Sequence, residues 1–224
     1  MMLHIPKVLA PEQVVECRRL LDAAEWIDGK ATVGEQGAMV KRNRQLPELS
    51  PLSKQLGEMI LSAVARHPLF FSAALPLKSV PPLFNRYEGG EAYGNHIDGA
   101  VRAVPGSSHF IRTDLSSTLF LSDPAEYDGG ELVMDTAGVP AAWRGNAGDV
   151  IVYPANTLHR VTEVTRGTRD VAISWIQSMV REGPRRRILY DLKTALEAFD
   201  ALPAPPVEAE AIRRSYLNLV RMWA

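Results

Sequence analysis

Short apolar runs alternate with turn residues from about residue 75 to residue 182, and this alternation constrains the fold more than any other feature of the sequence. Each run is short enough to be a single strand, and Gly, Asp or Pro lies beside most of them. The runs are 82–87, 116–121, 131–134, 149–153 and 171–176. Many short strands with such punctuation predict a β-sandwich or barrel rather than alternating strand–helix–strand units.

Helical patterns precede this β-region. Pro11 is typical of a first helical position, and the apolar spacing after it predicts a helix that runs to about Ala24. Ser50 and Pro51 predict the N-cap and the first position of a second helix. The segment 29–45 between them shows no clear period, and we expect it to be irregular or strand-like.

Helical patterns also follow the β-region. Apolar residues recur at spacings of three to four after Gly183, and the Pro-rich stretch 202–206 is expected to break that helix. A last helix has an apolar face that includes Trp223, and this face must pack against the β-core or a second subunit.

The sequence therefore predicts a mostly β chain with flanking helices, of the α+β class. We expect three regions: an N-terminal helical or mixed support over 1–74, a β-core over 75–182 and a small C-terminal helical domain over 183–224.

Composition narrows the partners and the compartment. The 25 basic and 26 acidic residues give a net charge of −1, which argues against a protein that holds nucleic acid electrostatically. Cys17 is the only cysteine, so an intrachain disulfide is excluded and a reducing compartment is expected. We see neither a signal-peptide pattern nor a run of about 18 apolar residues. We therefore expect a cytoplasmic protein without nucleic-acid or membrane partners.

A histidine and an aspartate lie two residues apart in the stretch GNHIDG, at His96 and Asp98. In an extended strand, residues i and i+2 point to the same face, so these two side chains would converge. Such a pair alone also fits an ordinary surface hydrogen bond. A metal site requires a third ligand from elsewhere in the chain.

His159 is the best candidate for that third ligand. It follows a strand-like run that stops at Pro154, and it opens the next extended run. Jelly-roll folds bring such strand ends together at the mouth of the barrel. Two imidazoles and one carboxylate, with open positions opposite, form the facial triad of non-haem Fe(II) oxygenases. The other histidines lie near the terminus, at a helix end and in a loop, where we expect surface residues: His4, His67 and His109.

Arg169 lies ten residues after His159, and several longer phrases surround these positions. They are NRYEGGEAYGNHIDG, RTDLSSTLFLS, YDGGELV, GDVIVYPANTLHRVTEVTRGTRDVAISWIQSMVR and RRRILYDL. In this order they resemble the PKHD-type hydroxylases, a bacterial branch of the Fe(II)/2-oxoglutarate-dependent dioxygenases that is related to prolyl and lysyl hydroxylases. The resemblance is strong over roughly residues 75 to 195 and weaker at the two ends.

This resemblance implies a double-stranded β-helix, which is a jelly-roll or cupin-like fold, with a small C-terminal helical domain. It implies His96, Asp98 and His159 as the catalytic ligands of Fe(2+). It also implies that Arg169 binds the far carboxylate of the co-substrate 2-oxoglutarate. A guanidinium suits that role because its planar fork pairs two carboxylate oxygens at once.

The implied enzyme is a dioxygenase that hydroxylates an unidentified substrate, peptidyl or siderophore-like, while 2-oxoglutarate is decarboxylated to succinate. Dioxygen is its other substrate, L-ascorbate is a supporting reductant, and the family is associated with iron uptake. A homodimer through the helix that contains Trp223 is a further expectation.

Alternatives stay open for individual residues. Arg169 could face solvent and pair with Asp170 or Glu163. Tyr87 fits either a hydrogen-bond donor to the co-substrate or a core tyrosine. Trp175 fits either a cavity wall or plain core packing.

Two other functions also stay open. A zinc-dependent hydrolase could use the same three ligands, but it needs a general base such as Glu91 or Glu131. A non-catalytic sensor would bind iron and 2-oxoglutarate without turning them over.

Gly129 and Gly130 predict a turn or bulge that lets two backbone segments come close.

Overall fold

The structure is a computed structural model that describes residues 1–136, 138–204 and 206–224. Its N-terminal elements are β1 (Leu3–Ile5), α1 (Pro11–Asp22), β2 (Ile27–Asp28), the 3-10 helix η1 (Gly29–Thr32), α2 (Glu35–Val40), β3 (Lys41–Arg42), β4 (Arg44–Gln45), α3 (Pro51–Arg66) and α4 (Pro68–Ala74).

The central strands follow without an intervening helix. They are β5 (Pro76–Ser79), β6 (Leu83–Glu88), β7 (Ala92–His96), β8 (Val101–Ala103), β9 (Phe110–Arg112), β10 (Leu115–Phe120), β11 (Asp128–Gly129), β12 (Leu132–Thr136), β13 (Val139–Trp143), β14 (Val150–Pro154), β15 (His159–Val161), β16 (Val164–Arg166) and β17 (Thr168–Ser178). The chain closes with the helices α5 (Gly183–Asp200) and α6 (Glu208–Trp223).

Two of the helices begin where the sequence predicts. Pro11 is the first residue of α1, and the Ser50 hydroxyl accepts a hydrogen bond from the Ser53 amide at the start of α3. The expectation for 29–45 is wrong in part, because η1 and α2 are helical. Helix α2 has only six residues and includes Gly37, so it is too short for a helical period to be recognised.

The strands form two main antiparallel sheets and two small two-stranded ones. The larger sheet has the order β1-β14-β10-β17-β6-β4-β2, with β5 also paired to β17. The second sheet has the order β13-β12-β15-β7-β3. Apart from the consecutive pair β12 and β13, neighbouring strands in the two main sheets are not consecutive in the sequence, as expected for a jelly roll. The predicted mostly β, jelly-roll class is confirmed.

The space between the two sheets is filled by apolar and aromatic side chains from both of them. The larger sheet contributes Tyr87, Phe120, Ile151, Tyr153 and Val171, and the second sheet contributes Leu132, Met134 and Val161. These contacts fix the distance between the sheets, and therefore the position of every side chain that points inward.

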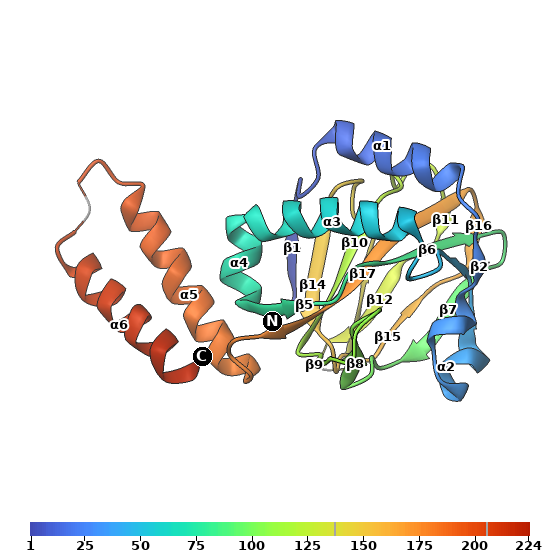
Figure 1. Cartoon of the computed structure of the whole chain (residues 1–224). Helices are drawn as coiled ribbons and strands as arrows, with labels where there is room; N and C mark the ends of the chain where they lie inside the picture. Colours follow the sequence, from blue (N-terminus) through green and yellow to red (C-terminus); the bar gives the residue numbers. More distant parts are fainter. Residues whose placement is uncertain (137, 205) are drawn as a thin grey trace.

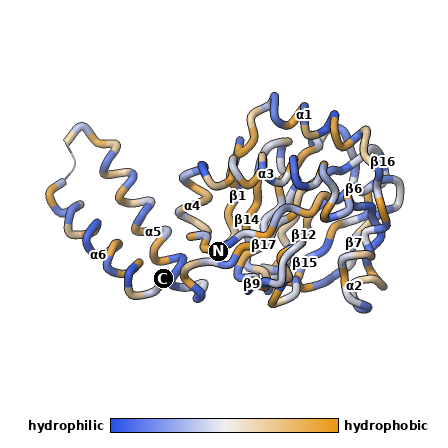
Figure 2. Tube along the Cα trace, in the orientation of Figure 1, coloured by the Kyte–Doolittle hydropathy of each residue, from blue (hydrophilic) through white to orange (hydrophobic). Residues whose placement is uncertain are grey.

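Helices α1 and α3 cover the outer face of the larger sheet (Figure 1). Cys17 and Leu21 of α1 and Leu56 and Ile60 of α3 are buried in one cluster with residues of that sheet. Figure 2 shows hydrophobic residues concentrated along the sheet strands, and hydrophilic and hydrophobic residues alternating along α5 and α6.

Helices α5 and α6 form a hairpin that extends away from the sheets (Figure 1). Leu189 of α5 is buried with Leu75 and Val180, and Trp223 of α6 packs against the same cluster. Helix α5 ends at Asp200, in agreement with the predicted break at 202–206, of which residue 205 lies outside the described residues. The three sequence regions stay a prediction as independent domains.

Candidate metal centre

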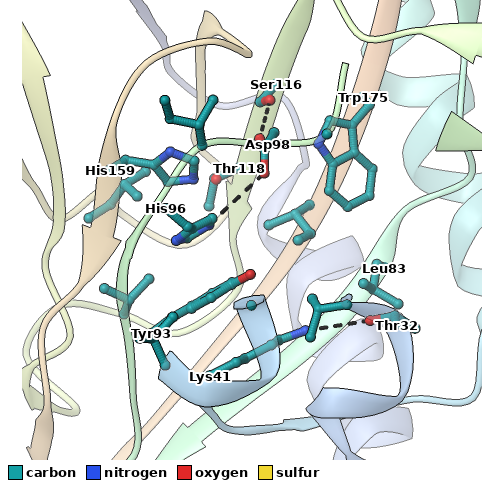
Figure 3. Close-up of a pocket in the computed structure, with 18 of the residues that line it drawn as sticks. Thr32, Lys41, Leu83, Tyr93, His96, Asp98, Ser116, Thr118, His159 and Trp175 are labelled. Atoms are coloured by element: carbon teal, nitrogen blue, oxygen red, sulfur yellow. Dashed lines mark hydrogen bonds and ion pairs between the residues drawn. The ribbon is translucent and has the colours of Figure 1, made fainter. Parts of the chain in front are cut away.

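Strand pairing brings the two central histidines together. Strand β7 ends at His96, β15 begins at His159, and these two residues are direct partners in the antiparallel register. Their ring centroids are 4.1 Å apart. Asp98 follows β7 by two residues, and one ligand atom from each of the three side chains lies within 4.8 Å of the others (Figure 3). The three predicted ligands thus meet at one point.

Each imidazole is oriented by a backbone carbonyl two residues earlier. His96 Nδ1 lies 2.8 Å from the Gly94 oxygen, and His159 Nδ1 lies 2.9 Å from the Thr157 oxygen. A carbonyl can only accept, so Nδ1 carries a proton in each ring, and in a neutral ring the lone pair then lies on Nε2. This is the tautomer in which protein imidazoles bind metal ions through Nε2.

The protonation states also suit a metal. Burial and the neighbouring His159 lower the pKa of His96 to about 4, so its ring is neutral at pH 7. Asp98 Oδ2 accepts a hydrogen bond from Ser116 Oγ at 2.5 Å, while Oδ1 lies 4.0 Å from His96 Nε2 (Figure 3). Two imidazoles and a carboxylate are the donor set of a facial triad, so these residues fit a divalent iron ion.

Arg169 points into the same cavity because β17 is extended. Alternate residues from 169 to 175 of this strand line the cavity, namely Arg169, Val171, Ile173 and Trp175, and Ser174 also contributes to it. Asp170 points the opposite way and accepts hydrogen bonds from Arg86 at 2.8 and 2.7 Å. Glu163 pairs with Arg42 at 3.7 Å. The alternative in which Arg169 faces solvent and pairs with Asp170 or Glu163 is therefore wrong.

The Arg169 guanidinium is buried and has no ion pair with an acid in the part of the chain that the structure describes. The residue is 1% exposed, and its Nε and Nη1 atoms have no hydrogen-bond partner among the residues that the structure describes. Its Cζ lies 5.2 Å from the Tyr87 ring and 5.8 Å from the Phe120 ring. A buried cation with unsatisfied donors is costly, so the geometry fits a bound carboxylate here.

Gly130 makes room for this arginine. It has a φ of +65°, and a Cβ atom at this position would lie 2.8 Å from Arg169 Cδ and 2.9 Å from Val164 Cγ2. Gly129 also has a positive φ, at a register shift between β11 and β16. The bulge predicted at this glycine pair is confirmed, and its role is to let the backbone approach Arg169.

One cavity of about 990 Å³ contains all five of the site residues predicted from the sequence. They are His96, Asp98, His159, Arg169 and Tyr87. Tyr87 is 3% exposed, and burial raises the pKa of its hydroxyl. Trp175 is both a cavity wall and a core residue, and the Arg102 guanidinium lies 4.0 Å from its ring centroid.

Several polar residues of the cavity were not predicted from the sequence. Ser116, Ser117 and Thr118 lie on β10 and line it, and the available signal was a polar triplet inside an otherwise apolar strand. Lys41 and Tyr93 also line it, from the neighbouring strands β3 and β7. No pattern in the sequence distinguished these two from surface residues.

The remaining histidines lie elsewhere. His4 Nε2 is 2.9 Å from Asp149 Oδ2 and the side chain is half-buried, His67 is the N-cap of α4, and His109 is exposed. Neither proposed base of a hydrolase lines the cavity: Glu91 accepts a hydrogen bond from the Glu88 amide, and Glu131 accepts one from Thr162.

Comparison with known proteins agrees with this geometry. A model of the 2OG-Fe(II) oxygenase superfamily matches residues 82–177, which include the triad and Arg169. Two solved structures with a similar fold are a Pseudomonas putida prolyl-4-hydroxylase and HygX from Streptomyces hygroscopicus with nickel and 2-oxoglutarate bound. The former has a TM-score of 0.52 and 21% identity, with 79% of this chain and 92% of that chain covered. The latter has a TM-score of 0.54 and 16% identity, with 81% and 84% covered.

Sequence relatives narrow the class to one family. A PKHD-type hydroxylase of Janthinobacterium sp. (strain Marseille) is 55% identical over 100% of this chain and 99% of its own length. The PKHD-type hydroxylase HEAR3399 of Herminiimonas arsenicoxydans is 54% identical with the same coverage. The chain belongs to the PKHD-type hydroxylases, as its resemblance implies, and is an enzyme of the 2OG-Fe(II) oxygenase class. None of the helices among the described residues is long and apolar enough to cross a membrane.

Proposed function

We propose that the chain hydroxylates a C–H bond of an organic substrate and couples this step to the oxidative decarboxylation of 2-oxoglutarate. Substrate, dioxygen and 2-oxoglutarate would give hydroxylated substrate, succinate and carbon dioxide. One observation carries the proposal: the buried Arg169 guanidinium, which has no ion pair among the described residues, shares a cavity with two imidazoles and a carboxylate that could hold one metal ion.

In this proposal His96, Asp98 and His159 would hold Fe(II). Iron bound there supplies the dioxygen chemistry that side chains alone cannot perform. The Gly94 and Thr157 carbonyls keep both rings in the ligating tautomer. This preorganisation reduces the rearrangement that metal binding requires.

Arg169 binds the far carboxylate of 2-oxoglutarate in this proposal. The Tyr87 ring lies against the guanidinium and limits its movement. Apolar side chains on the same strand face, Val171 and Ile173, exclude water from the site and strengthen the ion pair. Tyr87 is the second co-substrate residue that we propose.

The finer parts of the proposal follow from the family resemblance. The substrate is peptidyl or siderophore-like, L-ascorbate keeps the iron ferrous, and the reaction takes place in the cytoplasm in connection with iron uptake. A homodimer through the Trp223 face of α6 belongs to the same proposal.

The test is an anaerobic titration of the metal-free protein with Fe(II) and 2-oxoglutarate. We expect a visible charge-transfer band only when both are present, and its loss together with succinate formation when oxygen is admitted. His96→Ala and Asp98→Ala should abolish the band and succinate formation, whereas His109→Ala, at an exposed histidine, should change neither.

Each other outcome has a definite meaning. Full activity of His96→Ala would contradict the assignment of the ligands. A stable band that never yields succinate, even with candidate substrates, would favour a sensor of iron and 2-oxoglutarate. No band from a folded, iron-loaded protein would show that the keto acid does not bind as proposed.

A further inference from the structure

Lys41 is a second buried cation in the cavity, and the proposed reaction does not use it. Antiparallel pairing places Lys41 of β3 opposite Tyr93 of β7. The Tyr93 ring stacks on the His96 ring with centroids 3.6 Å apart and an interplanar angle of 11°. Lys41 Nζ lies 5.5 Å from the centre of this same Tyr93 ring (Figure 3). Tyr93 therefore contacts both the lysine and the candidate metal ligand His96.

The Lys41 ammonium has only neutral partners. The residue is 2% exposed, and its Nζ donates to Gln45 Oε1 at 3.3 Å and to Thr32 Oγ1 at 3.5 Å. Both hydrogen bonds are long for an ammonium, which has three protons to donate. Within residues 1–136, 138–204 and 206–224, no carboxylate lies within 4.0 Å of this nitrogen.

The acids whose charges act on Lys41 are already engaged by other groups. Asp28 accepts a hydrogen bond from the Lys30 amide, Glu48 lies 2.5 Å from Arg102 Nη2, and Asp98 accepts from Ser116. These acids act on Lys41 from a distance, and Arg102 opposes them. Burial outweighs the acids and lowers the pKa of Lys41 to about 8, so most molecules carry an unpaired ammonium at pH 7.

A second unsatisfied donor lies beside the first. The Nε2 atom of Gln45 is buried and has no acceptor among the described residues, while Oε1 of the same amide receives Lys41 and Thr32. Buried polar groups in native proteins normally have partners. Lys41 lines the cavity, and the buried Gln45 amide lies behind it with its Nε2 unsatisfied. A buried ammonium without an anion at the cavity wall indicates that an acceptor from outside the chain completes the cluster.

We propose that Lys41 is the anion-binding residue for the substrate that becomes hydroxylated, and that this substrate presents a carboxylate to it. The proposal rests on the proposed function, in which Arg169 is engaged by the co-substrate and is not available to a second acid. The cavity of about 990 Å³ is at the upper end of the range for drug-sized ligands, so a five-carbon diacid does not fill it.

The position of Lys41 relative to the metal ligands determines how a bound carboxylate would orient the substrate. The Tyr93 ring lies between Lys41 and His96 (Figure 3), so a carboxylate anchored at Lys41 leaves the rest of the substrate to extend past this ring toward His96. Fixing a reacting C–H bond relative to the metal is the positioning contribution of an enzyme. The substrate is thus an acid that is long enough to reach from Lys41, past the Tyr93 ring, to the metal ligands.

The experiment uses two matched pairs of probes and the protein loaded anaerobically with Fe(II) and 2-oxoglutarate. Benzoate and benzamide represent a free acid, and the N-methylamides of N-acetylaspartate and N-acetylasparagine represent a peptide side chain. Calorimetry measures the affinity of each probe, and the charge-transfer band reports the co-substrate independently. The proteins are wild type, Lys41→Met, Lys41→Arg and, as a control at an exposed lysine, Lys54→Met.

We expect the acid of at least one pair to bind wild type about ten-fold or more tightly than its amide, since charge-assisted hydrogen bonds are the stronger kind. Which pair responds separates a free acid from a peptidyl one. Lys41→Met should lose the preference for the acid and retain the charge-transfer band. Lys41→Arg should keep part of the acid preference, and Lys54→Met should behave as wild type.

Three results would overturn the proposal. One is the absence of any acid preference in wild type, including no binding of either pair. Another is a preference that survives in Lys41→Met. The third is a loss of 2-oxoglutarate affinity in Lys41→Met, which would make Lys41 a co-substrate residue. Absence of the band in wild type is a different result and contradicts the proposed function itself.

Discussion

Arg169 and Lys41 are both buried cations on the wall of one cavity, but the chain supports them in different ways. Arg169 lies in the eleven-residue strand β17, opposite Tyr87 of β6, and Gly130 lets the backbone approach it closely. Lys41 lies in the two-residue strand β3, which directly follows the short helix α2. The first is part of the rigid β-core, and the second belongs to a segment of short elements.

This difference in support suggests a difference in role: Arg169 binds the co-substrate that the whole enzyme class shares, and Lys41 recognises the substrate of this enzyme. A residue in a long strand keeps its direction when the surface changes, as suits a co-substrate that every member of an enzyme class uses. A residue between short elements can be moved by small changes of sequence, as suits a group that recognises one substrate. We therefore expect the two cations to respond differently to each of the following changes.

The largest expected effect is on 2-oxoglutarate binding, and it should differ between the variants that lack Arg169 and those that lack Lys41. Arg169→Met should raise the concentration of 2-oxoglutarate that is needed for half-maximal band formation by about 100-fold, because it leaves a buried carboxylate unpaired. Lys41→Met should change that concentration by less than about three-fold, since Lys41 is assigned to the other acid. Anaerobic titrations of both variants with 2-oxoglutarate measure this directly, and equal effects would remove the distinction.

The strands around Arg169 and the direction of its side chain could be predicted from the sequence. The five apolar runs became strands, and the even offset between Arg169 and Trp175 placed both on one face of β17, where they line the cavity. The facial triad was also predictable, because His96 and His159 lie at strand ends that a jelly roll brings together. Regular alternation makes the direction of a side chain readable from its position.

The burial of Lys41 in the cavity wall could not be predicted from the sequence. The segment 29–45 was expected to be irregular or strand-like, and six residues of α2 give no readable period. Lysines are nearly always exposed, so the burial of this one depends on which strand pairs with β3, and that is tertiary information. The hydrogen bond from Ser116 to Asp98 was missed for the same reason, since it joins β10 to the loop after β7.

The next effect tests whether metal affinity is independent of both cations. Ser116→Ala removes the hydroxyl that holds Asp98 Oδ2 and should weaken metal binding by about 10- to 100-fold. Ser117→Ala is the matched control, because the Ser117 hydroxyl donates to the Ser174 carbonyl and not to the triad. Competition with a chelator measures the affinity, and a comparable loss in Lys41→Met would show that the cation supports the metal.

A third change tests the rigid support of Arg169. Gly130→Ala puts a Cβ atom 2.8 Å from Arg169 Cδ at a positive φ, so it should lower the free energy of unfolding by about 1–3 kcal/mol and weaken 2-oxoglutarate binding. Gly89→Ala is the control, because no atom lies within 4 Å of its Cβ position. Denaturant unfolding and the charge-transfer band provide the two measurements. Unchanged 2-oxoglutarate affinity would show that Arg169 does not depend on this packing.

The smallest effect concerns the unpaired ammonium of Lys41 in the protein without substrate. Its pKa falls from 10.5 in the unfolded chain to about 8 in the folded one, so below pH 8 the folded state holds a charge that burial disfavours by about 3 kcal/mol. Lys41→Met removes this penalty and also two long hydrogen bonds, each worth about 0.5–1 kcal/mol. The variant should therefore be more stable than wild type at pH 7 by about 1–2 kcal/mol.

That advantage should change with pH in a defined direction. Between pH 8 and 10.5 the unfolded state binds more protons at Lys41 than the folded state does, so wild type gains stability relative to the variant as the pH rises. The difference should shrink through this window and reverse near its upper end, where only the lost hydrogen bonds remain. Urea unfolding of both proteins at several pH values measures the difference. A constant difference would mean that Lys41 has an acid partner in solution, and that its burial, like that of Arg86 beside Asp170, is already compensated within the chain.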